Sequence, residues 1–297
     1  MKIIVVGTTF IDIKGFPLDT FIPTGRNAGR VEQVDGGVGR NIAESINSLG
    51  AETVFVSLID HSGMSKDLLQ HIKDVGINCD YVKETDDGLG TWLAVFDEHG
   101  DVCASISKRA DLHPICDILD EYGDEIYKGA TCVLPEIDME EPLLDRIFDL
   151  AERHNVDVYS VISNMTIGSD RLEYIKRSKC FVCNLLEAGI LFGEDAEALS
   201  PEVMLLLLKQ KIKELQINSM VVTMGSEGCV YASLDGQEGF CPSQKISVVD
   251  TTGAGDAFFA GLSYALAEGK PLKDACELGS AVAAKVVQSL SNVYLRD

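Results

Sequence analysis

Apolar residues in this chain form two patterns: short continuous runs, and longer stretches with helical spacing. Residues 2–7 (KIIVVG) are a continuous run of strand length, typical of a strand buried on both faces of a sheet. Between Asn41 and Leu49 the apolar residues recur at helical spacing, and Gly50 follows where such a helix would end. The same patterns predict these further elements in chain order: a strand at 53–58, a helix at 66–75, strands at 91–97, 102–107 and 130–134, a helix at 141–154, a strand at 156–161, a helix at 170–177, a strand at 180–183, a helix at 201–216, a strand at 219–223, a hairpin around Gly236 and a long helical tail after Gly253.

The alternation of strands with helices of ten or more residues indicates the fold class. It predicts βαβ units and one α/β domain over residues 1–297, with a doubly wound, mostly parallel sheet flanked by helices. Two segments, about 14–35 and 91–112, have no helix between their strands, and we interpret them as a small β-sheet lid. A short sheet with an open face and open edges is unstable alone, so we expect a homodimer that forms through the lid.

The charge balance narrows the possible partners. Asp and Glu number 47 against 25 Lys and Arg, a formal net charge of -22, which repels nucleic acid and anionic membranes. No apolar run is long enough to span a bilayer, and the start of the chain reads as a strand and not as a signal peptide. The 9 cysteines are scattered, as free thiols in a reducing cytoplasm would be. We therefore expect a cytoplasmic protein without nucleic-acid or membrane partners.

The strongest chemical motif is DTTGAGD, residues 250–256, between a strand-like segment and a helical pattern. Glycines at a helix start leave the amides of Gly253, Ala254 and Gly255 open to an oxyanion or a phosphate. Asp256 follows directly, where a carboxylate would repel a bound phosphate but could take a proton from an attacking hydroxyl. The motif alone is equally compatible with a tight turn followed by an acid that stabilises its helix.

A second glycine-rich segment, Gly36–Asn41, also opens a helix. Gly36 and Gly37 allow close approach of a ligand, and Asn41 offers donors and acceptors to hydroxyl groups. Asp12 lies in the predicted turn after the first strand, at the carboxyl end where doubly wound sheets bind ligands. Asp12 and Asn41 together could hold a sugar, although a turn residue and a helix cap would explain them equally well.

Two further segments follow predicted strands. Thr223, Gly225 and Gly228 provide small residues that could border nucleotide phosphates, or a simple hairpin turn. Asn184 and Glu187 lie one helical turn apart and could order water around Mg²⁺, or form a reciprocal helix cap.

Cys180 and Cys183 do not indicate a metal site. Residues three apart on a strand point to opposite faces, and no second pair of this spacing exists in the sequence. We expect buried structural thiols there, and we assign the 5 histidines no role.

The combination of these motifs resembles the ribokinase-like carbohydrate kinases, the PfkB family. Residues 250–258 (DTTGAGDAF) match the C-terminal signature of the family, and residues 36–63 match its N-terminal signature. The order of the remaining motifs agrees along nearly the whole chain. The resemblance implies a ribokinase-like fold and an ATP-dependent phosphotransferase that acts on an alcohol group.

The resemblance also implies a role for each motif position. Asp256 would deprotonate a primary hydroxyl, and the amides of Gly253, Ala254 and Gly255 would form an anion hole for the phosphoryl group. Implied contacts are the substrate with Asp12, Gly36, Gly37, Arg40 and Asn41; ATP with Asn184, Thr223, Gly225 and Gly228; and Mg²⁺, through water, with Glu187. In some members a monovalent cation such as K⁺ lies beside the anion hole, which would involve Asp250 and Thr252 here.

Within the family, the segment Gly36–Asn41 followed by Ile42 and Ala43 resembles the pseudouridine kinases. One departure lies at residues 159–164 (YSVISN), where many family members carry Asp-Pro after the central strand. The leading hypothesis is phosphorylation of the 5′-hydroxyl of a nucleoside or sugar, with pseudouridine preferred.

Other hypotheses stay open. One is a kinase of ribose, of adenosine or inosine, or of a sugar phosphate such as fructose phosphate. The basic residues available to a substrate phosphate are Lys14, Arg26, Arg30, Arg40, Lys108 and Arg109. A non-catalytic sugar-binding regulator on the same fold is the alternative from another class.

Overall fold

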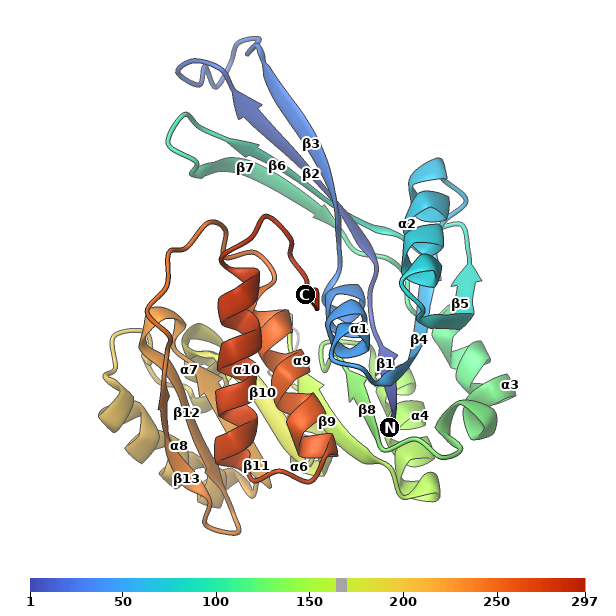
Figure 1. Ribbon diagram of the computed structural model, residues 1–297, viewed down its shortest axis with the longest axis vertical. Helices are drawn as coiled ribbons and strands as arrows, with labels where there is room; N and C mark the ends of the chain where they lie inside the picture. The colour runs from blue at the N-terminus through green and yellow to red at the C-terminus, as the bar shows by residue number, and fades with distance from the viewer. Residues whose placement is uncertain (164–169, 297) are drawn as a thin grey trace.

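The computed structural model describes residues 1–163 and 170–296, which form a large sheet and a small sheet (Figure 1). The nine-stranded sheet has the order β13-β12-β11-β10-β9-β8-β1-β4-β5, and the four-stranded sheet has the order β3-β2-β6-β7. The large sheet contains β1 (Lys2–Val6), β4 (Glu52–Ile59), β5 (Asn78–Glu84), β8 (Cys132–Pro135), β9 (Asp157–Val161), β10 (Cys180–Asn184), β11 (Ser219–Thr223), β12 (Gly228–Ser233) and β13 (Glu238–Pro242). Its strands are parallel except for the antiparallel β11-β12-β13 edge, which confirms the predicted fold class.

Helices cover both faces of the large sheet. One face carries α1 (Val38–Ser48), α2 (Gly63–Asp74), α9 (Ala254–Ala267) and α10 (Leu272–Val286). The other face carries α3 (Pro114–Tyr127), α4 (Glu141–His154), α6 (Leu172–Arg177), α7 (Leu185–Phe192) and α8 (Pro201–Leu215). The parallel strands are continuous apolar runs because each is buried between these two helical layers.

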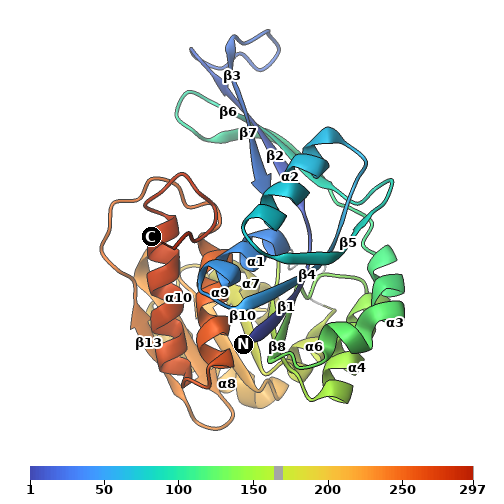
Figure 2. The same ribbon diagram turned by 45° about the vertical axis from the view of Figure 1, so that its right-hand side comes forward.

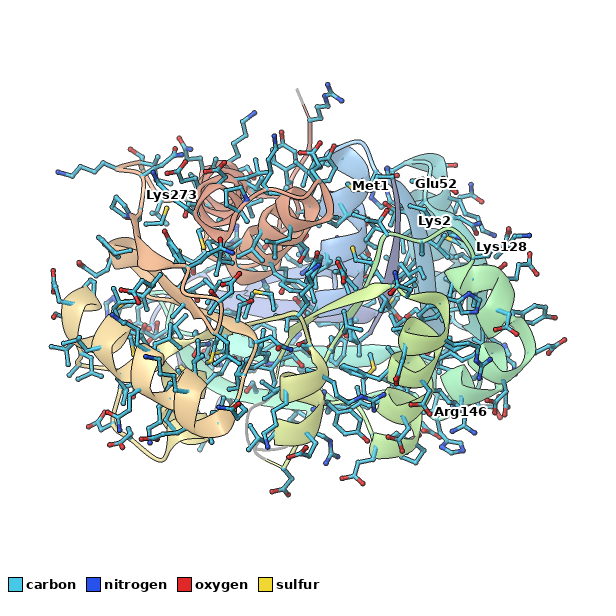
Figure 3. All side chains as sticks on the ribbon, turned by 90° about the horizontal axis from the view of Figure 1, so that it is seen from below. Met1, Lys2, Glu52, Lys128, Arg146 and Lys273 are labelled. Carbon is cyan, nitrogen blue, oxygen red and sulfur yellow. The ribbon has the colours of Figure 1, made fainter. Side chains whose placement is uncertain are left out.

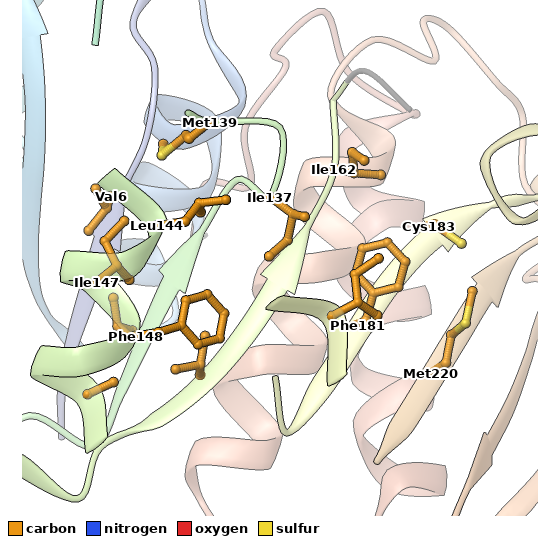
Figure 4. Packing of buried hydrophobic residues seen from close by; sticks show 14 of the residues in the cluster. Val6, Ile137, Met139, Leu144, Ile147, Phe148, Ile162, Phe181, Cys183 and Met220 are labelled. Carbon is orange, nitrogen blue, oxygen red and sulfur yellow. The ribbon is translucent and has the colours of Figure 1, made fainter. Parts of the chain in front are cut away.

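Each face of the large sheet has its own apolar core. Figure 4 shows part of one core, to which Ile147 and Phe148 of α4 and Phe181 of β10 all belong. Alternation along β10 sends Cys183 into this core and Cys180 into the core on the other face. Both cysteines are buried and free, as the sequence predicted.

The parallel strands begin at the edge of the sheet that Figure 3 views. There Glu52 donates its backbone N–H to the Met1 carbonyl at 2.9 Å, and Lys2 Nζ donates to the Lys128 carbonyl at 3.2 Å. The carboxyl ends of the strands therefore lie at the opposite edge. The small sheet stands above that edge in both ribbon views (Figures 1 and 2).

The small sheet contains β2 (Phe10–Pro17), β3 (Gly29–Gly36), β6 (Gly90–Phe96) and β7 (Val102–Lys108). Asp12 belongs to β2, so its placement in a turn was wrong. The chain turns between Val6 and Phe10, and Asp12 then pairs with Val34 on one side and Trp92 on the other. This register makes Asp12 part of the surface that faces the large domain.

Other differences concern the helices and one edge strand. The tail after Gly253 is two helices and not one, because Gly269 has φ 79° and ends α9 before α10 begins. The sequence patterns did not identify edge strand β5 or helices α3 and α7. Within the described residues, no helix is long and apolar enough to cross a membrane.

Candidate active site

A cavity of about 300 Å³, the first cavity, lies between the large domain and the small sheet. Its floor includes Gly37, Asn41, Gly253 and Asp256, from the starts of α1 and α9. This position, at the carboxyl ends of parallel strands, is where open α/β sheets place their ligands.

The start of α9 builds one side of the floor. Gly253 has φ 77°, and a Cβ at this position would lie 2.1 Å from the Asn292 carbonyl oxygen, so no other residue fits. Asp250 Oδ1 accepts hydrogen bonds from Thr252 N and Thr252 Oγ1, both at 2.8 Å, which fix the preceding turn. Ala254 N donates to the Thr251 carbonyl at 3.2 Å. Gly253 N and Gly255 N have no acceptor within the described residues and remain available to an anion.

Asp256 lies half-buried at the floor of the first cavity. Its Oδ2 accepts a hydrogen bond from Asn41 Nδ2 at 2.7 Å, which joins α1 to α9. Burial raises the pKa of Asp256 from 3.8 to about 6, whereas the Asn41 bond and the Arg40 charge lower it and nearby Asp12 raises it. A carboxylate with a pKa of about 6 is mostly ionised at neutral pH and can accept a proton.

The start of α1 builds the other side of the floor. Gly37 has φ 101°, and a Cβ there would lie 2.5 Å from the Thr8 carbonyl oxygen. The loop after β1 is fixed by Glu136, whose Oε1 accepts from Thr8 N at 2.7 Å and Thr8 Oγ1 at 2.9 Å. The same oxygen accepts from Gly39 N at 3.1 Å. Burial, with the Asp138 charge, raises the pKa of Glu136 to about 7. No local pattern in the sequence marks Glu136 as part of the site.

Three residues of the small sheet form a row across the roof of the first cavity. Asp12 pairs with Trp92 in register, and Trp92 pairs with Ser107. Cross-strand partners lie on the same face of a sheet, and all three line the cavity. Desolvation raises the pKa of Asp12, although the Lys14 and Arg40 charges lower it.

The first cavity also contains an arginine to which no sequence motif points. Arg109 lines the cavity, and its Nη2 donates to Asp138 Oδ2 at 2.5 Å. Ser163, which also lines the cavity, donates from Oγ to Asp138 Oδ2 at 2.8 Å and from N to Asp138 Oδ1 at 3.2 Å. Segment 159–164, which departs from the family pattern, ends at a residue that lies outside the described residues.

Arg40 and Gly36, both expected to contact substrate, do not line the cavity. The Arg40 side chain is only 4% exposed and pairs with Glu44 at 3.3 Å. Its Nη1 also lies 3.4 Å from Asn292 Oδ1. Gly36 packs against the Asp12 carboxylate, 3.1 Å from where its Cβ would lie. In this structure both residues support the site from behind its lining.

A second cavity, of about 820 Å³, lies beside the first. The expected nucleotide positions Thr223, Gly225 and Gly228 line it, while Asn184 does not. Residues 251–256 separate the two cavities. Thr252, Gly253 and Asp256 line the first cavity, whereas Thr251, Ala254 and Gly255 line the second.

Asn184 and Glu187 form the reciprocal cap of α7. Asn184 N donates to Glu187 Oε2 at 2.7 Å, and Glu187 N donates to Asn184 Oδ1 at 2.9 Å. Desolvation raises the pKa of Glu187 against the Asn184 bond, and the charges of Asp138 and Asp256 raise it further. This negative field, with Glu187 Oε1 not engaged by the cap, fits a hydrated Mg²⁺ held through its waters.

One histidine lies in a group of side chains of the metal-ligating type. Within the described residues this group consists of His113, Cys116 and Glu140, whose ligand atoms lie within 4.8 Å of one another. His113 and Cys116 flank the start of α3, and none of the three lines either cavity. This group was missed because Glu140 meets it only through the tertiary fold.

Comparison with known proteins supports a common ancestry over the full chain. A profile of the pfkB family carbohydrate kinases matches residues 1–294. The guanosine-inosine kinase of Exiguobacterium acetylicum is 30% identical, over 98% of this chain and 96% of that protein. The pseudouridine kinase of Escherichia coli (strain K12) is 26% identical, over 92% and 86%. The solved structure of ribokinase from Giardia lamblia, 18% identical, superposes with a TM-score of 0.85 over 99% of this chain and 97% of that one. With this fold and these two cavities, the chain belongs to the pfkB family of carbohydrate kinases, enzymes that phosphorylate hydroxyl groups with ATP.

Proposed function

We propose that this kinase phosphorylates the 5′-hydroxyl of a nucleoside, with Asp256 as the general base. The observation that supports this is the mixed lining of the first cavity. Asp12, Asn41 and Asp256 offer hydrogen bonds to sugar hydroxyls. Trp92, the neighbour of Asp12 in the small sheet, and Arg109 offer a flat apolar ring and a planar donor group, which suit a nucleobase.

In this proposal each floor residue has a role in the transfer. Asp12 and Asn41 would hold the ribose so that its 5′-hydroxyl lies beside Asp256, which takes the proton as the oxygen attacks. The free amides of Gly253 and Gly255 would stabilise the charge on the transferred phosphoryl group. ATP would occupy the second cavity, so that its γ-phosphate meets the acceptor at residues 251–256. Mg²⁺, with waters ordered by Glu187, would neutralise phosphate charge.

The charges that line the first cavity disfavour a phosphorylated substrate. Among its described lining residues Arg109 is the one cation, and Asp138 already pairs with it. Asp12 and Asp256 add two carboxylates. The lining groups thus present two carboxylates and one paired cation to a dianionic phosphate, and Lys14 and Arg40 behind the lining offset only part of that negative charge; a neutral nucleoside meets no such repulsion. This argues against a fructose-phosphate kinase. The complete base and amide arrangement argues against a non-catalytic regulator.

The identity of the nucleoside is a narrower part of the proposal. Pseudouridine is the acceptor that the segment Gly36–Asn41 suggests, and one relative is named as a pseudouridine kinase. Another relative is named as a guanosine-inosine kinase, which makes these purine nucleosides candidates as well. All three nucleosides share the ribose and differ only in the base, which in this proposal would lie against Trp92.

A substrate panel tests this function. The purified protein is incubated with MgATP and with guanosine, inosine, pseudouridine, adenosine, ribose or fructose 6-phosphate, and products are identified by mass. We expect nucleoside 5′-monophosphates, and a loss of about 10²- to 10⁴-fold in kcat for Asp256→Asn. Transfer to the sugar or sugar phosphate alone would refute the nucleoside assignment, and an active Asp256→Asn would refute the base.

We also propose that the small sheet pairs with a second copy of this chain. Its outer face exposes Val31 at 71% and Ile106 at 70%, with Leu93 opposite Ile106 in register. Covering such a face requires an apolar partner surface, and an identical face supplies one. Sedimentation at micromolar concentration should show a dimer that Ile106→Glu dissociates. A monomeric wild-type protein would refute this.

A monovalent cation beside the anion hole is the last part of the proposal. Asp250 and the loop around Val287 lie together, since Val249 N donates to the Val287 carbonyl at 2.7 Å. Replacing K⁺ by a large organic cation in the assay should lower kcat. An unchanged kcat would remove the cation from the mechanism.

A further inference from the structure

Arg109 is held more rigidly than an exposed arginine normally is. Its partner Asp138 has a side chain that is 0% exposed, while Arg109 itself is 37% exposed. Asp138 is in turn fixed by two hydrogen bonds from Ser163, one to each carboxylate oxygen. A buried carboxylate held on both oxygens fixes the orientation of the guanidinium that it binds.

The fixed guanidinium presents only donors to the first cavity. Arg carries five N–H groups and no acceptor. Asp138 engages one N–H of Nη2, so the second N–H of Nη2 and the N–H groups of Nε and Nη1 have no acceptor within the described residues. Ser107 and its cross-strand partner Trp92 line the same cavity as Arg109, and Trp92 offers a flat surface to an aromatic base. A planar ligand that binds beside Arg109 therefore meets a guanidinium edge that can donate hydrogen bonds but cannot accept them.

We propose that Arg109 determines base specificity and selects 6-oxopurine nucleosides, an inference that rests on the proposed nucleoside kinase activity. Guanine and hypoxanthine place the O6 and N7 acceptors side by side. The second N–H of Nη2, with the adjacent N–H of Nε or Nη1, forms an arginine fork that can donate to both. Adenine replaces O6 by an amino group, whose N–H would face the N–H of Arg109. Uracil bases offer a single carbonyl next to N–H or C–H. Their contact with Arg109 should therefore be weaker than that of 6-oxopurines and stronger than that of adenine. Asp138 acts as a positioning residue, because it holds the fork without contact to the base.

Two measurements on the wild-type enzyme test the contact without any mutation. The kcat/KM for inosine should exceed that for adenosine by about 5- to 150-fold, the range of a good bidentate arginine–base contact. 7-Deazaguanosine lacks the N7 acceptor and keeps the rest of guanosine. Its kcat/KM should fall below that of guanosine by about 5-fold or more.

Variants then assign the effect to Arg109. In Arg109→Met the penalty for 7-deazaguanosine and the preference for inosine over adenosine should both fall to within about twofold of unity. Because this change leaves Asp138 buried without its partner, the double variant Arg109→Met/Asp138→Asn serves as the stable counterpart. The control is Arg26→Met, since Arg26 is exposed and lines neither cavity. It should keep the wild-type ratios.

The outcomes separate this inference from the function on which it rests. A wild-type enzyme that phosphorylates no nucleoside overturns the proposed function. An enzyme that phosphorylates nucleosides but treats 7-deazaguanosine and guanosine alike overturns the role of Arg109 alone. The role of Arg109 is also overturned if both variants lower kcat/KM equally for inosine, adenosine and ribose, because a structural defect would act on all three.

Discussion

Replacing Asp256 by Asn should make the protein more stable at pH 8 while it removes most of the activity. Burial raises the pKa of Asp256 from 3.8 to about 6 in the folded protein, so the folded state resists ionisation more than the unfolded chain does. Below about pH 3.8 the group is protonated in both states and destabilises neither. As the pH rises through about 6, the folded protein must carry a buried charge, and stability is lost. Asn at this position carries no charge, and its Oδ1 can still accept the Asn41 hydrogen bond.

The size of the effect follows from the two pKa values. A difference of one pKa unit corresponds to about 1.4 kcal/mol, so the ionised carboxylate costs up to about 3 kcal/mol at pH 8. Asp256 borders the first cavity, where water screens the charge, and we therefore expect about 1.5 kcal/mol. At pH 5 the gain should be about half as large, since the folded carboxyl is then mostly protonated.

Thermal and urea unfolding of both proteins at pH 5 and pH 8 measure this gain. A stabilisation of about 1.5 kcal/mol raises Tm by about 3 to 6 °C in a chain of this size. The matched control is Asp19→Asn at an exposed position, which should change stability by less than about 0.5 kcal/mol. If Asp256→Asn is no more stable than the wild type at pH 8, or if the gain is the same at both pH values, the reasoning about its burial is wrong.

Three further results follow from the site. The kcat/KM should fall about tenfold per pH unit below pH 6, because Asp256 must be ionised to accept a proton; a flat profile down to pH 5 would contradict this. Gly253→Ala should lower kcat by about 100-fold or more and destabilise the protein by about 2 kcal/mol, because its Cβ would lie 2.1 Å from the Asn292 carbonyl oxygen. Near-normal activity of that variant would exclude the tight turn. Glu187→Gln keeps an acceptor for the cap of α7 and should raise the Mg²⁺ concentration for half-maximal activity by about 10-fold; an unchanged Mg²⁺ dependence would remove Glu187 from the metal site.

The large sheet could be predicted because its signals are local. β1 and β10 are continuous apolar runs, and α4 has the 141–154 bounds that its spacing indicated. The small sheet was harder to predict, because successive residues of β2 point alternately into the cavity and into the core. Phe10 and Asp12 face the cavity, while Ile11 is buried in the core. The sequence pattern of one carboxylate between apolar residues is compatible with a turn and with such a strand, and so it did not identify the strand.

The parts of the site that the sequence did not reveal depend on distant pairs. Glu136 meets Thr8 across 128 residues, and Arg109 meets Asp138 across 29. Neither pair has a spacing that any local rule recognises. Thr8 and Glu136 meet because β8 pairs with β1, and Arg109 and Asp138 meet because the residue after β7 packs against the loop after β8. Asn184 and Glu187 show a different limit of prediction from sequence, because their spacing was recognised but their role was not. The helix cap and the metal role were posed as alternatives, yet a capped pair can keep an oxygen for a hydrated ion, and only the geometry shows that the two are compatible.

The row formed by Asp12, Trp92 and Ser107 has a consequence for how this enzyme can diversify. Trp92, Ser107 and Arg109 all belong to one continuous stretch, β6 to β7 and the residue after it, whereas the groups proposed to transfer the phosphoryl group sit on the helical floor. If these residues select the acceptor as proposed, the stretch from Gly90 to Arg109 can be exchanged as one unit to change acceptor choice. Grafting the corresponding hairpin of another family member, with a matched residue at Asp138, should redirect the enzyme to a new nucleoside without rebuilding its catalytic centre.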